Sequence, residues 1–259
     1  MIRIAIANQK GGVGKTTTAI NVATALAATG WRTLLIDIDP QGNASTGIGV
    51  SASARNASSY DVLVDGVPVS QCVMPTKIPG LDLLAATVDL SGAEVELVNG
   101  EDRAHRLQRA LRAPDLPYDV CLIDCPPSLG LLTLNALTAA DTLLVPLQCE
   151  FFALEGLSQL LTTVERVQQR FNPDLGIIGI ALTMFDRRNR LTEQVSEDVR
   201  SCLGQLIFET TIPRNVRLSE APSHGVPALI YDHACAGSRA YMALARELIT
   251  RLPEKRKAA

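Results

Sequence analysis

Short apolar runs alternate along the chain with longer segments in which apolar residues recur every three or four positions. The runs have the length and composition of strands buried on both faces, and the longer segments have the spacing of amphipathic helices. This alternation predicts an α/β fold, a mostly parallel twisted sheet with helices on both faces. We predict strands at residues 2–7, 33–39, 81–86, 118–124, 142–147, 175–184 and 206–210.

Helices are predicted between these strands, at residues 15–26, 60–64, 103–111, 129–139, 153–171, 192–203 and 238–252. The last helix carries one apolar face, formed by Tyr241, Leu244, Ala245, Leu248 and Leu252. Residues 44–59 are rich in Ala, Ser and Gly and are predicted to form a surface loop. Neither a repeat nor a linker divides the pattern, so we predict a single domain over residues 1–259.

Composition narrows the class of protein. Hydrophobic residues make up 47% of the 259 residues and aromatic residues only 4%, so aliphatic side chains must build the core. The net charge of −3 excludes a global field that attracts nucleic acid, so such binding needs a local patch. The six cysteines form no C-x-x-C pair and are predicted to be buried thiols. With no signal peptide and no apolar run that spans a bilayer, we expect a cytoplasmic protein.

A glycine-rich turn follows the first predicted strand. Gly11, Gly12 and Gly14 precede Lys15 and Thr16, which open a helix. Strand, glycine turn, Lys-Thr and helix are the parts of a phosphate-binding loop. Glycines let backbone N–H groups point into one concavity, and the helix N-terminus adds positive charge. We predict that Lys15 contacts the β- and γ-phosphates and that Thr16 ligates Mg²⁺.

The loop departs from the usual G-x-x-x-x-G-K-[ST] pattern, because Gln9 stands at the first glycine position and Lys10 follows it. The segment KGGVGKT, residues 10–16, resembles the deviant Walker A loop of the ParA/MinD family. The resemblance implies a P-loop NTPase-like fold that binds ATP and Mg²⁺. It also implies that Lys10 reaches across a dimer to the partner's nucleotide. The nucleotide contacts it implies here are Lys10, Gly11, Gly12, Val13, Gly14, Lys15, Thr16 and Thr17.

Three carboxylates, Asp37, Asp39 and Asp124, stand at predicted strand ends. Ligands of open parallel sheets bind beyond these ends, and phosphoryl transfer needs carboxylates for Mg²⁺ and for the attacking water. Aspartates also end strands as turn formers, but the neighbouring phosphate loop favours the catalytic role. The family resemblance assigns the hydrolytic water to Asp39 and support of Mg²⁺ to Asp124. The predicted catalytic residues are therefore Lys10, Lys15 and Asp39, and the metal set is Thr16, Asp39 and Asp124.

Two later segments, residues 183–188 and 212–223, resemble those that wall the adenine in this family. They place Met184, Pro213 and Arg214 at the base, although residue types alone fit solvent-facing loops equally well. The whole chain is most similar to the small chromosomal ParA (Soj) proteins. That resemblance implies an ATP-dependent homodimer on the nucleoid that binds double-stranded DNA non-specifically, through Arg188 and Arg217. It also implies a ParB-like centromere-binding protein that stimulates slow ATP hydrolysis.

Three alternatives remain open at this point. A MinD-like ATPase would act on a membrane, but the tail after Pro253 is short and lacks bulky apolar anchors, so we expect no stable membrane binding. An ATPase that positions a protein cluster would share the loop and the carboxylates. A nitrogenase-iron-protein type would bridge a metal cluster between subunits, but Cys125 has no evident second cysteine in a suitable later loop.

Overall fold

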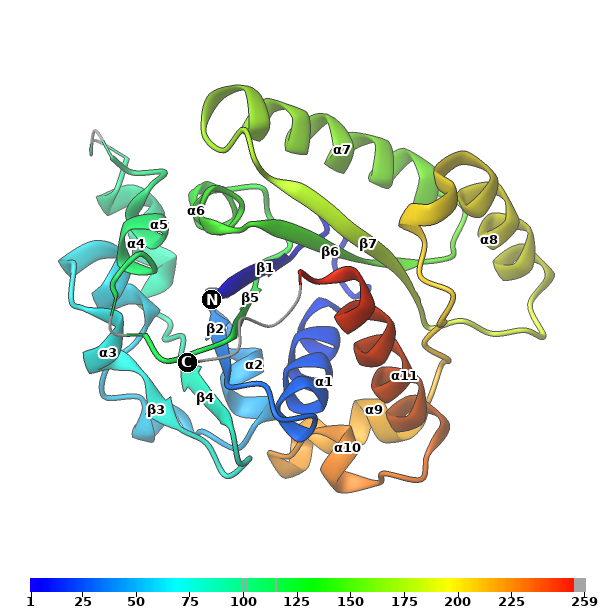
Figure 1. The fold of residues 1–259 in the computed structure, drawn as a ribbon, viewed down its shortest axis with the longest axis horizontal. Helices are drawn as coiled ribbons and strands as arrows, with labels where there is room; N and C mark the ends of the chain where they lie inside the picture. The colour runs from blue at the N-terminus through cyan, green and yellow to red at the C-terminus, as the bar shows by residue number, and fades with distance from the viewer. Residues whose placement is uncertain (99, 101, 115, 254–259) are drawn as a thin grey trace.

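A twisted sheet forms the centre of the fold (Figure 1). The computed structural model describes residues 1–98, 100, 102–114 and 116–253. In these ranges seven strands lie in the order β3-β4-β2-β5-β1-β6-β7, and only the β3–β4 pair is antiparallel. The predicted fold class is confirmed. The strands are β1 (Ile2–Ile6), β2 (Thr33–Asp37), β3 (Met74–Pro75), β4 (Leu81–Leu84), β5 (Val120–Asp124), β6 (Thr142–Gln148) and β7 (Gly176–Thr183).

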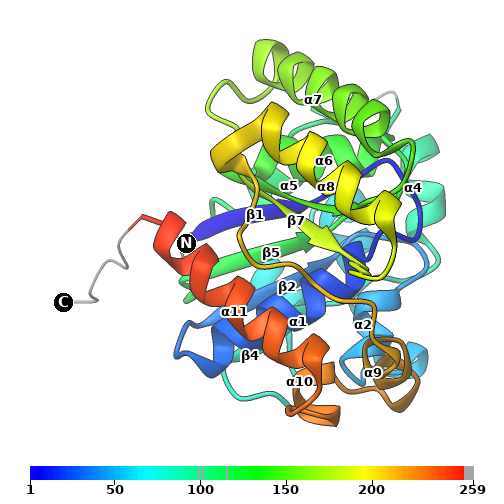
Figure 2. The same cartoon turned by 90° about the vertical axis from the view of Figure 1, so that its right-hand side faces the viewer.

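Helices cover both faces of the sheet, as Figures 1 and 2 show together. One face carries α1 (Lys15–Ala28), α2 (Asn43–Gly47), α9 (Val216–Glu220), α10 (Ala228–Tyr231) and α11 (Ala236–Arg251). The other face carries α4 (Leu90–Glu96), α5 (Arg106–Ala110), α6 (Leu131–Ala139), α7 (Ala153–Arg170) and α8 (Arg190–Leu203). Short turns complete the chain: α3 (Val69–Cys72), a π-turn at Asp61–Asp65 and 3₁₀ turns at Ala52–Ala54, Gly204–Leu206 and Ala221–His224.

The core lies in two layers, one on each side of the sheet. In β1, Ile4 packs toward α1 and α11, whereas Ala5 packs toward α6 and α7. In β2, Leu35 and Leu34 divide between the two layers in the same way. Successive side chains of a strand point to opposite faces, so both kinds of position must be apolar when helices cover both faces. This explains why the strands read as continuous apolar runs in the sequence.

The last helix docks through the face that its sequence pattern predicts. Tyr241, Leu244, Ala245, Leu248 and Leu252 are all buried. The Tyr241 hydroxyl lies 3.1 Å from Thr18 Oγ1 and so joins α11 to α1 by a buried hydrogen bond. No helix in the described ranges combines the length and the apolar character that crossing a bilayer requires.

Two sequence predictions about secondary structure are wrong. Residues 44–59 are not simply a surface loop: they contain part of α2 and a 3₁₀ turn, and Ser45 and Ser59 are fully buried. Residues 206–210 form no strand, because they pair with β7 only through an isolated bridge between Ile207 and Ile180. The Arg251 side chain donates hydrogen bonds to carbonyls of both segments, at Ile178 (3.0 Å) and Ile207 (3.2 Å). These side-chain hydrogen bonds help to join residues 206–210 to β7.

Candidate nucleotide-binding site

The phosphate loop joins β1 to α1. Gly12 and Gly14 adopt φ angles of 74° and 87°, a left-handed conformation that favours glycine. No side chain in the described part of the chain caps the N-terminus of α1, which leaves its amides available to an anion. The loop is tied to neighbouring strands: Asn8 Nδ2 donates to the Pro146 carbonyl of β6 at 2.7 Å, and Thr183 Oγ1 of β7 donates to the Val13 carbonyl at 2.8 Å.

A hollow of about 370 Å³ lies against this loop, and we call it the phosphate hollow. Lys15 is almost buried in it, and its Nζ donates to the Lys10 carbonyl at 3.0 Å. Burial lowers the pKa of Lys15, and the charge of the nearby Asp124 acts in the opposite direction. The hollow is lined by Gly11, Gly12, Gly14, Lys15, Thr16, Thr17, Asp39, Gln41, Asn43, Pro127 and Met184. Two of the predicted nucleotide contacts, Lys10 and Val13, are absent from this lining.

The strand-end carboxylates divide into different tasks. Asp37 and Asp124 lie opposite each other in the β2–β5 register. Asp37 is fully buried and accepts hydrogen bonds from Ser45 N (2.9 Å), Ser45 Oγ (2.7 Å) and Asp39 N (3.1 Å). Burial raises the pKa of Asp37 to about 6, against the effect of these donors. Asp37 therefore holds the chain after β2 in place, whereas Asp39 lines the hollow with its Oδ1 fixed by the Gln41 amide at 2.9 Å.

The Asp124 carboxylate lacks hydrogen-bond partners among the described residues. Both its oxygens are buried without a hydrogen-bond partner of acceptable geometry in the described residues, although the Thr16 hydroxyl lies close enough to favour the charged form. Burial raises its pKa well above the usual range. Orphaned buried oxygens beside a threonine hydroxyl fit a hard cation such as Mg²⁺. The described ranges hold no group of three or more His, Cys, Asp or Glu side chains that could bind a metal ion, so phosphate and water must supply other ligands.

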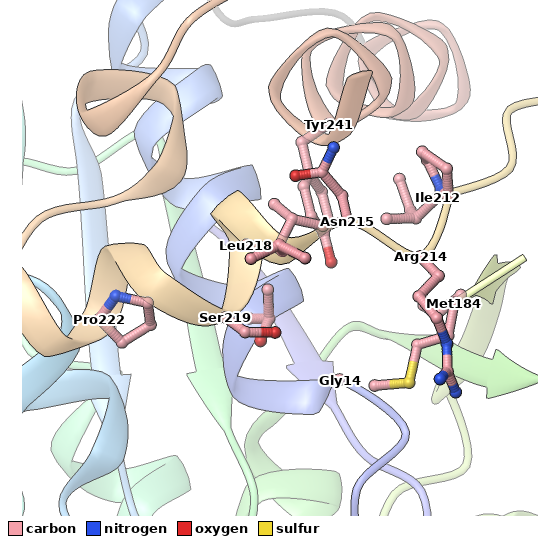
Figure 3. Close-up of a pocket in the computed structure, with 13 residues that line it drawn as sticks. Gly14, Met184, Ile212, Arg214, Asn215, Leu218, Ser219, Pro222 and Tyr241 are labelled. Atoms are coloured by element: carbon pink, nitrogen blue, oxygen red, sulfur yellow. The ribbon is translucent and has the colours of Figure 1, made fainter. Parts of the chain in front are cut away.

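A second cavity, of about 480 Å³, opens beside the phosphate hollow (Figure 3). It shares Gly14, Thr17 and Met184 with that hollow. Met184 has a φ angle of 50°, the only positive value among the described non-glycine residues, and in Figure 3 its side chain lies beside Arg214. The second cavity is lined by Gly14, Thr17, Thr183, Met184, Ile212, Pro213, Arg214, Asn215, Val216, Leu218, Ser219, Pro222 and Tyr241. The predicted base contacts Met184, Pro213 and Arg214 therefore meet at this second cavity, which we call the base cavity.

Residues 212–223 are predicted to wall the base, but the sequence singles out neither Leu218 and Ser219 within that segment nor Tyr241 outside it. The spacing of Tyr241 predicts only that it belongs to the core face of the last helix. Leu218 and Ser219 lie on α9, a five-residue helix too short to give a periodic signal. Asn215 caps α9 through its Oδ1, which accepts from Arg217 N at 2.9 Å, so an N-cap signature could have located this turn.

Lys10 is not among the described residues that line the phosphate hollow of its own chain. Its Nζ forms an ion pair with Glu150, which follows β6. Both side chains stay partly exposed, at 39% and 45%. Beside them, Phe151 and Phe152 are exposed aromatic residues whose rings meet edge to face at 5.0 Å. Lys10 therefore lies at a partly exposed edge, next to apolar surface.

The two arginines predicted to bind DNA lie on separate elements. Arg188 precedes α8 and pairs with Asp186 at 2.9 Å. Arg217 belongs to α9 and pairs with Glu220 at 2.9 Å and with Asp232 at 3.5 Å. Neither lines the phosphate hollow or the base cavity. If these arginines do not bind DNA, the sequence offers the basic tail residues Lys255, Arg256 and Lys257 instead, which lie outside the described residues.

Comparison with known proteins decides the family. The model of a family described as an AAA domain matches residues 1–177. Over 250 residues the chain is 59% identical to the chromosome partitioning protein ParA of Caulobacter vibrioides (strain NA1000 / CB15N). The match covers 96% of this chain and 94% of that protein. The chain belongs to the ParA family of chromosome-partitioning ATPases. The predicted family, ATPase activity and partition class are thereby confirmed.

Two further similarities bear on this ParA-family chain. It is 53% identical over 245 residues to the sporulation initiation inhibitor protein Soj of Bacillus subtilis (strain 168), covering 95% of this chain and 97% of that protein. A solved structure from Mycobacterium smegmatis, described as cobyrinic acid a,c-diamide synthase with bound ATP analog and magnesium, is 39% identical with a TM-score of 0.83. It covers 96% of this chain and 94% of that one. The ATP analog and magnesium bound in that structure match ATP and Mg²⁺, the cofactors that the sequence predicts.

Cysteine placement bears on the iron–sulfur alternative. Cys125 is fully buried, and its Sγ contacts the Ile123 carbonyl at 3.6 Å. Cys72, Cys121 and Cys149 are buried too, whereas Cys202 is exposed and Cys235 half-buried. The prediction of buried thiols is therefore right for four of the six. A buried Cys125 does not present its sulfur at a surface where two subunits could share a cluster.

Proposed function

We propose that this ParA-family chain works as one ATPase domain that forms a sandwich homodimer when ATP is bound. The observation that carries the proposal is the position of Lys10. It belongs to the phosphate loop, yet it does not line the phosphate hollow of its own chain and lies at an exposed edge beside Glu150. A lysine so placed is available to the phosphates of a second copy. The exposed Phe151 and Phe152 give the same edge apolar surface to bury.

Within each chain, the site residues take distinct roles in hydrolysis. Lys15 offsets the charge of the β- and γ-phosphates, and the free amides of α1 hold their oxygens. Thr16 and Asp124, with Asp39 nearby, would hold Mg²⁺, which would neutralise phosphate charge. Asp39 orients the attacking water, because it lines the hollow with one oxygen already fixed by the Gln41 amide.

The cargo contact is proposed to be the phosphate backbone of double-stranded DNA, through Arg188 and Arg217. The chain has a net charge of −3 and both arginines already pair with carboxylates, so a single copy should bind weakly. A dimer doubles the contacts, which makes DNA binding depend on ATP and on salt but not on sequence. A ParB-like centromere-binding protein would stimulate hydrolysis and release the dimer from the nucleoid.

Sedimentation with two kinds of bait tests the proposal. The protein is mixed with plain duplex DNA or with anionic liposomes, each in the presence of ATP or ADP. We expect co-sedimentation with DNA only with ATP, and none with liposomes. Liposome binding without DNA binding would favour the membrane ATPase instead. An ATP-dependent dimer that binds neither bait would favour the ATPase that positions a protein cluster.

A further inference from the structure

A third hollow, of about 530 Å³, adjoins the base cavity and shares Pro213 and Arg214 with it. We call it the arginine hollow, because three arginines line it. Its other lining is largely apolar, from Phe185, Pro213, Ala236 and Ala240. The lining is completed by Asp186, Arg187, Arg188, Thr211 and Arg214. Cationic and apolar surface are thus combined in one concavity.

The charges of the arginine hollow do not cancel. Asp186 is the single carboxylate among the described residues that line it, and it accepts two hydrogen bonds from the Arg188 side chain, of 3.0 and 2.9 Å. Arg187 is exposed and makes no hydrogen bond or ion pair with any described residue. Arg214 uses only its backbone, whose N–H donates to the Phe185 carbonyl at 3.2 Å. One carboxylate against three guanidinium groups leaves the hollow with about two positive charges. The charge of Arg214 also acts on Asp186, but the hydrogen bonds to that carboxylate come from Arg188, so the guanidinium groups of Arg187 and Arg214 keep their donors for a ligand.

Arg214 also connects this hollow to the nucleotide. It lines the base cavity and the arginine hollow at once, and it borders a smaller hollow of about 200 Å³ that includes Glu150. Figure 3 shows its side chain beside Met184, at the base-cavity side. The Phe185–Pro213 bridge makes the wall between the two cavities a single pair of extended segments. A ligand on either side therefore acts on the same residue.

We propose that the arginine hollow seats one backbone phosphodiester of duplex DNA, held by Arg187 and Arg214. The inference rests on the proposed DNA binding and adds a contact residue, Arg187, to it. A phosphodiester carries a single negative charge, which two unpaired guanidinium groups can hold without a base-specific contact. The apolar lining suits deoxyribose, which has no 2′-hydroxyl to satisfy. Because Arg214 borders both sites, nucleotide in the base cavity and DNA in the hollow should affect each other's affinity reciprocally.

The test measures the affinity of the ATP-bound protein for a plain short duplex at several salt concentrations. Arg187→Ala removes one phosphate contact from each subunit, so the slope of log K against log salt should fall by about 2 per dimer. Arg187→Lys keeps a cation and should retain the wild-type slope. Arg190→Ala is the matched control, because Arg190 is equally an exposed arginine but lies outside the hollow, at the start of α8.

The outcomes separate this inference from the function on which it rests. If wild type and Arg190→Ala bind DNA with ATP and Arg187→Ala keeps their slope, the phosphate is seated elsewhere and the inference is overturned. An equal loss in Arg187→Ala and Arg190→Ala also overturns it, because general charge would then explain the effect. Failure of the wild type itself to bind DNA with ATP overturns the proposed DNA binding and this inference with it.

Discussion

At the scale of single residues, the phosphate hollow depends on charged groups that the fold buries next to each other. Lys15 is nearly buried, and Asp124 lies close enough to affect its pKa. Each is costly to bury alone, and each partly compensates the other until nucleotide and metal are present. The hollow is therefore prepared in advance for a ligand that carries both phosphate and Mg²⁺.

Lys15→Ala should weaken ATP binding by the single chain. A charge-assisted hydrogen bond is worth roughly 1.5–3 kcal/mol, so we expect the affinity to fall roughly 10- to 150-fold. Isothermal titration with a non-hydrolysable ATP analogue measures it. Lys77→Ala is the control, because Lys77 is an exposed lysine near the β3 edge of the sheet. An unchanged affinity in Lys15→Ala would remove Lys15 from the phosphate contacts.

Lys10→Ala should separate binding from dimerisation. The Lys10 side chain contacts Glu150 and not the hollow of its own chain, so the affinity of the single chain for ATP should be unchanged. The dimer should be lost, because the partner's phosphates lose their cross-subunit charge. Light scattering with and without ATP gives the mass. A wild-type dimer in this variant would contradict the cross-subunit role.

Asp39→Ala should stop the cycle after dimerisation. If Asp39 orients the attacking water, its loss should slow hydrolysis roughly 10²- to 10⁴-fold while ATP binding continues. In the proposed cycle hydrolysis dismantles the ATP-bound dimer, so the dimer should accumulate in this variant. Phosphate release in the presence of duplex DNA measures turnover, with Asp174→Ala, an exposed aspartate after α7, as control. Near-normal turnover in Asp39→Ala would exclude the role.

Sequence predicted these residues but not all of their surroundings. A glycine turn and strand-end aspartates have fixed meanings in a parallel sheet, so positions as distant as Thr16, Asp39 and Asp124 could be placed together. The anchoring role of Asp37 could not be predicted, because Asp37 and Asp39 are indistinguishable until Ser45 is seen to donate to one of them. The contact between Lys10 and Glu150 spans 140 positions and leaves no local pattern.

At the scale of elements, α2 explains how Asp39 is held over the hollow. The hydroxyl of the buried Ser45 of α2 donates to Asp37 at 2.7 Å. The Ser45 Oγ atom also accepts a hydrogen bond from Ala86 N at 3.1 Å. This one side chain joins the end of β2 to the segment that follows β4. The segment between β2 and α2, which includes Asp39, is therefore fixed at both ends.

Ser45→Ala should destabilise the protein and loosen this segment. It leaves the buried Asp37 carboxylate and the Ala86 amide each short of a partner, at a cost of roughly 1–3 kcal/mol. Urea unfolding measures the loss as a lower midpoint. Ser91→Ala, on the exposed side of α4, is the control and should keep the wild-type midpoint. A wild-type midpoint in Ser45→Ala would mean that the two hydrogen bonds contribute no net stability.

The predicted elements succeed where periodicity is long or burial is complete. The strands β1, β2, β5, β6 and β7 and the helices α1, α6, α7, α8 and α11 all lie where the pattern predicts, within a few residues at the ends. The misses are short. The helices α3, α4, α9 and α10 have seven residues or fewer, too few for a face to repeat. The two-residue β3 is defined by its pairing with β4 and not by its own sequence.

At the scale of the whole molecule, charge is arranged locally and not as a field. The net charge is −3, and the two predicted DNA contacts lie apart, Arg188 before α8 and Arg217 on α9, as Figure 2 shows by the separation of these helices. Each arginine is held by a carboxylate in an exposed ion pair, which contributes little stability and exchanges readily for a phosphate. DNA bound to both would have to extend across this side of the molecule.

Arg188→Glu and Arg217→Glu should each weaken DNA binding without affecting ATP binding or dimerisation. Each removes one phosphate contact per subunit, so the slope of log K against log salt should fall by about 2 per dimer. Arg217→Glu should also lose more affinity at low salt than Arg188→Glu. It leaves Glu220 and Asp232 unpaired beside the new carboxylate, whereas Arg188→Glu leaves only Asp186. The difference should shrink as salt screens these charges.

Fluorescence anisotropy of a labelled duplex at several salt concentrations, with ATP present, distinguishes the two variants. Arg166→Glu is the matched control: Arg166 is an exposed arginine of α7, which lies across the sheet from α9 in Figure 1. It changes net charge by the same amount and should keep the wild-type slope. If all three variants lose slope equally, binding responds to total charge alone. If Arg188→Glu and Arg217→Glu both keep the wild-type slope and affinity, the DNA path does not cross α9 or the start of α8, and the basic residues after Pro253 become the segment to test.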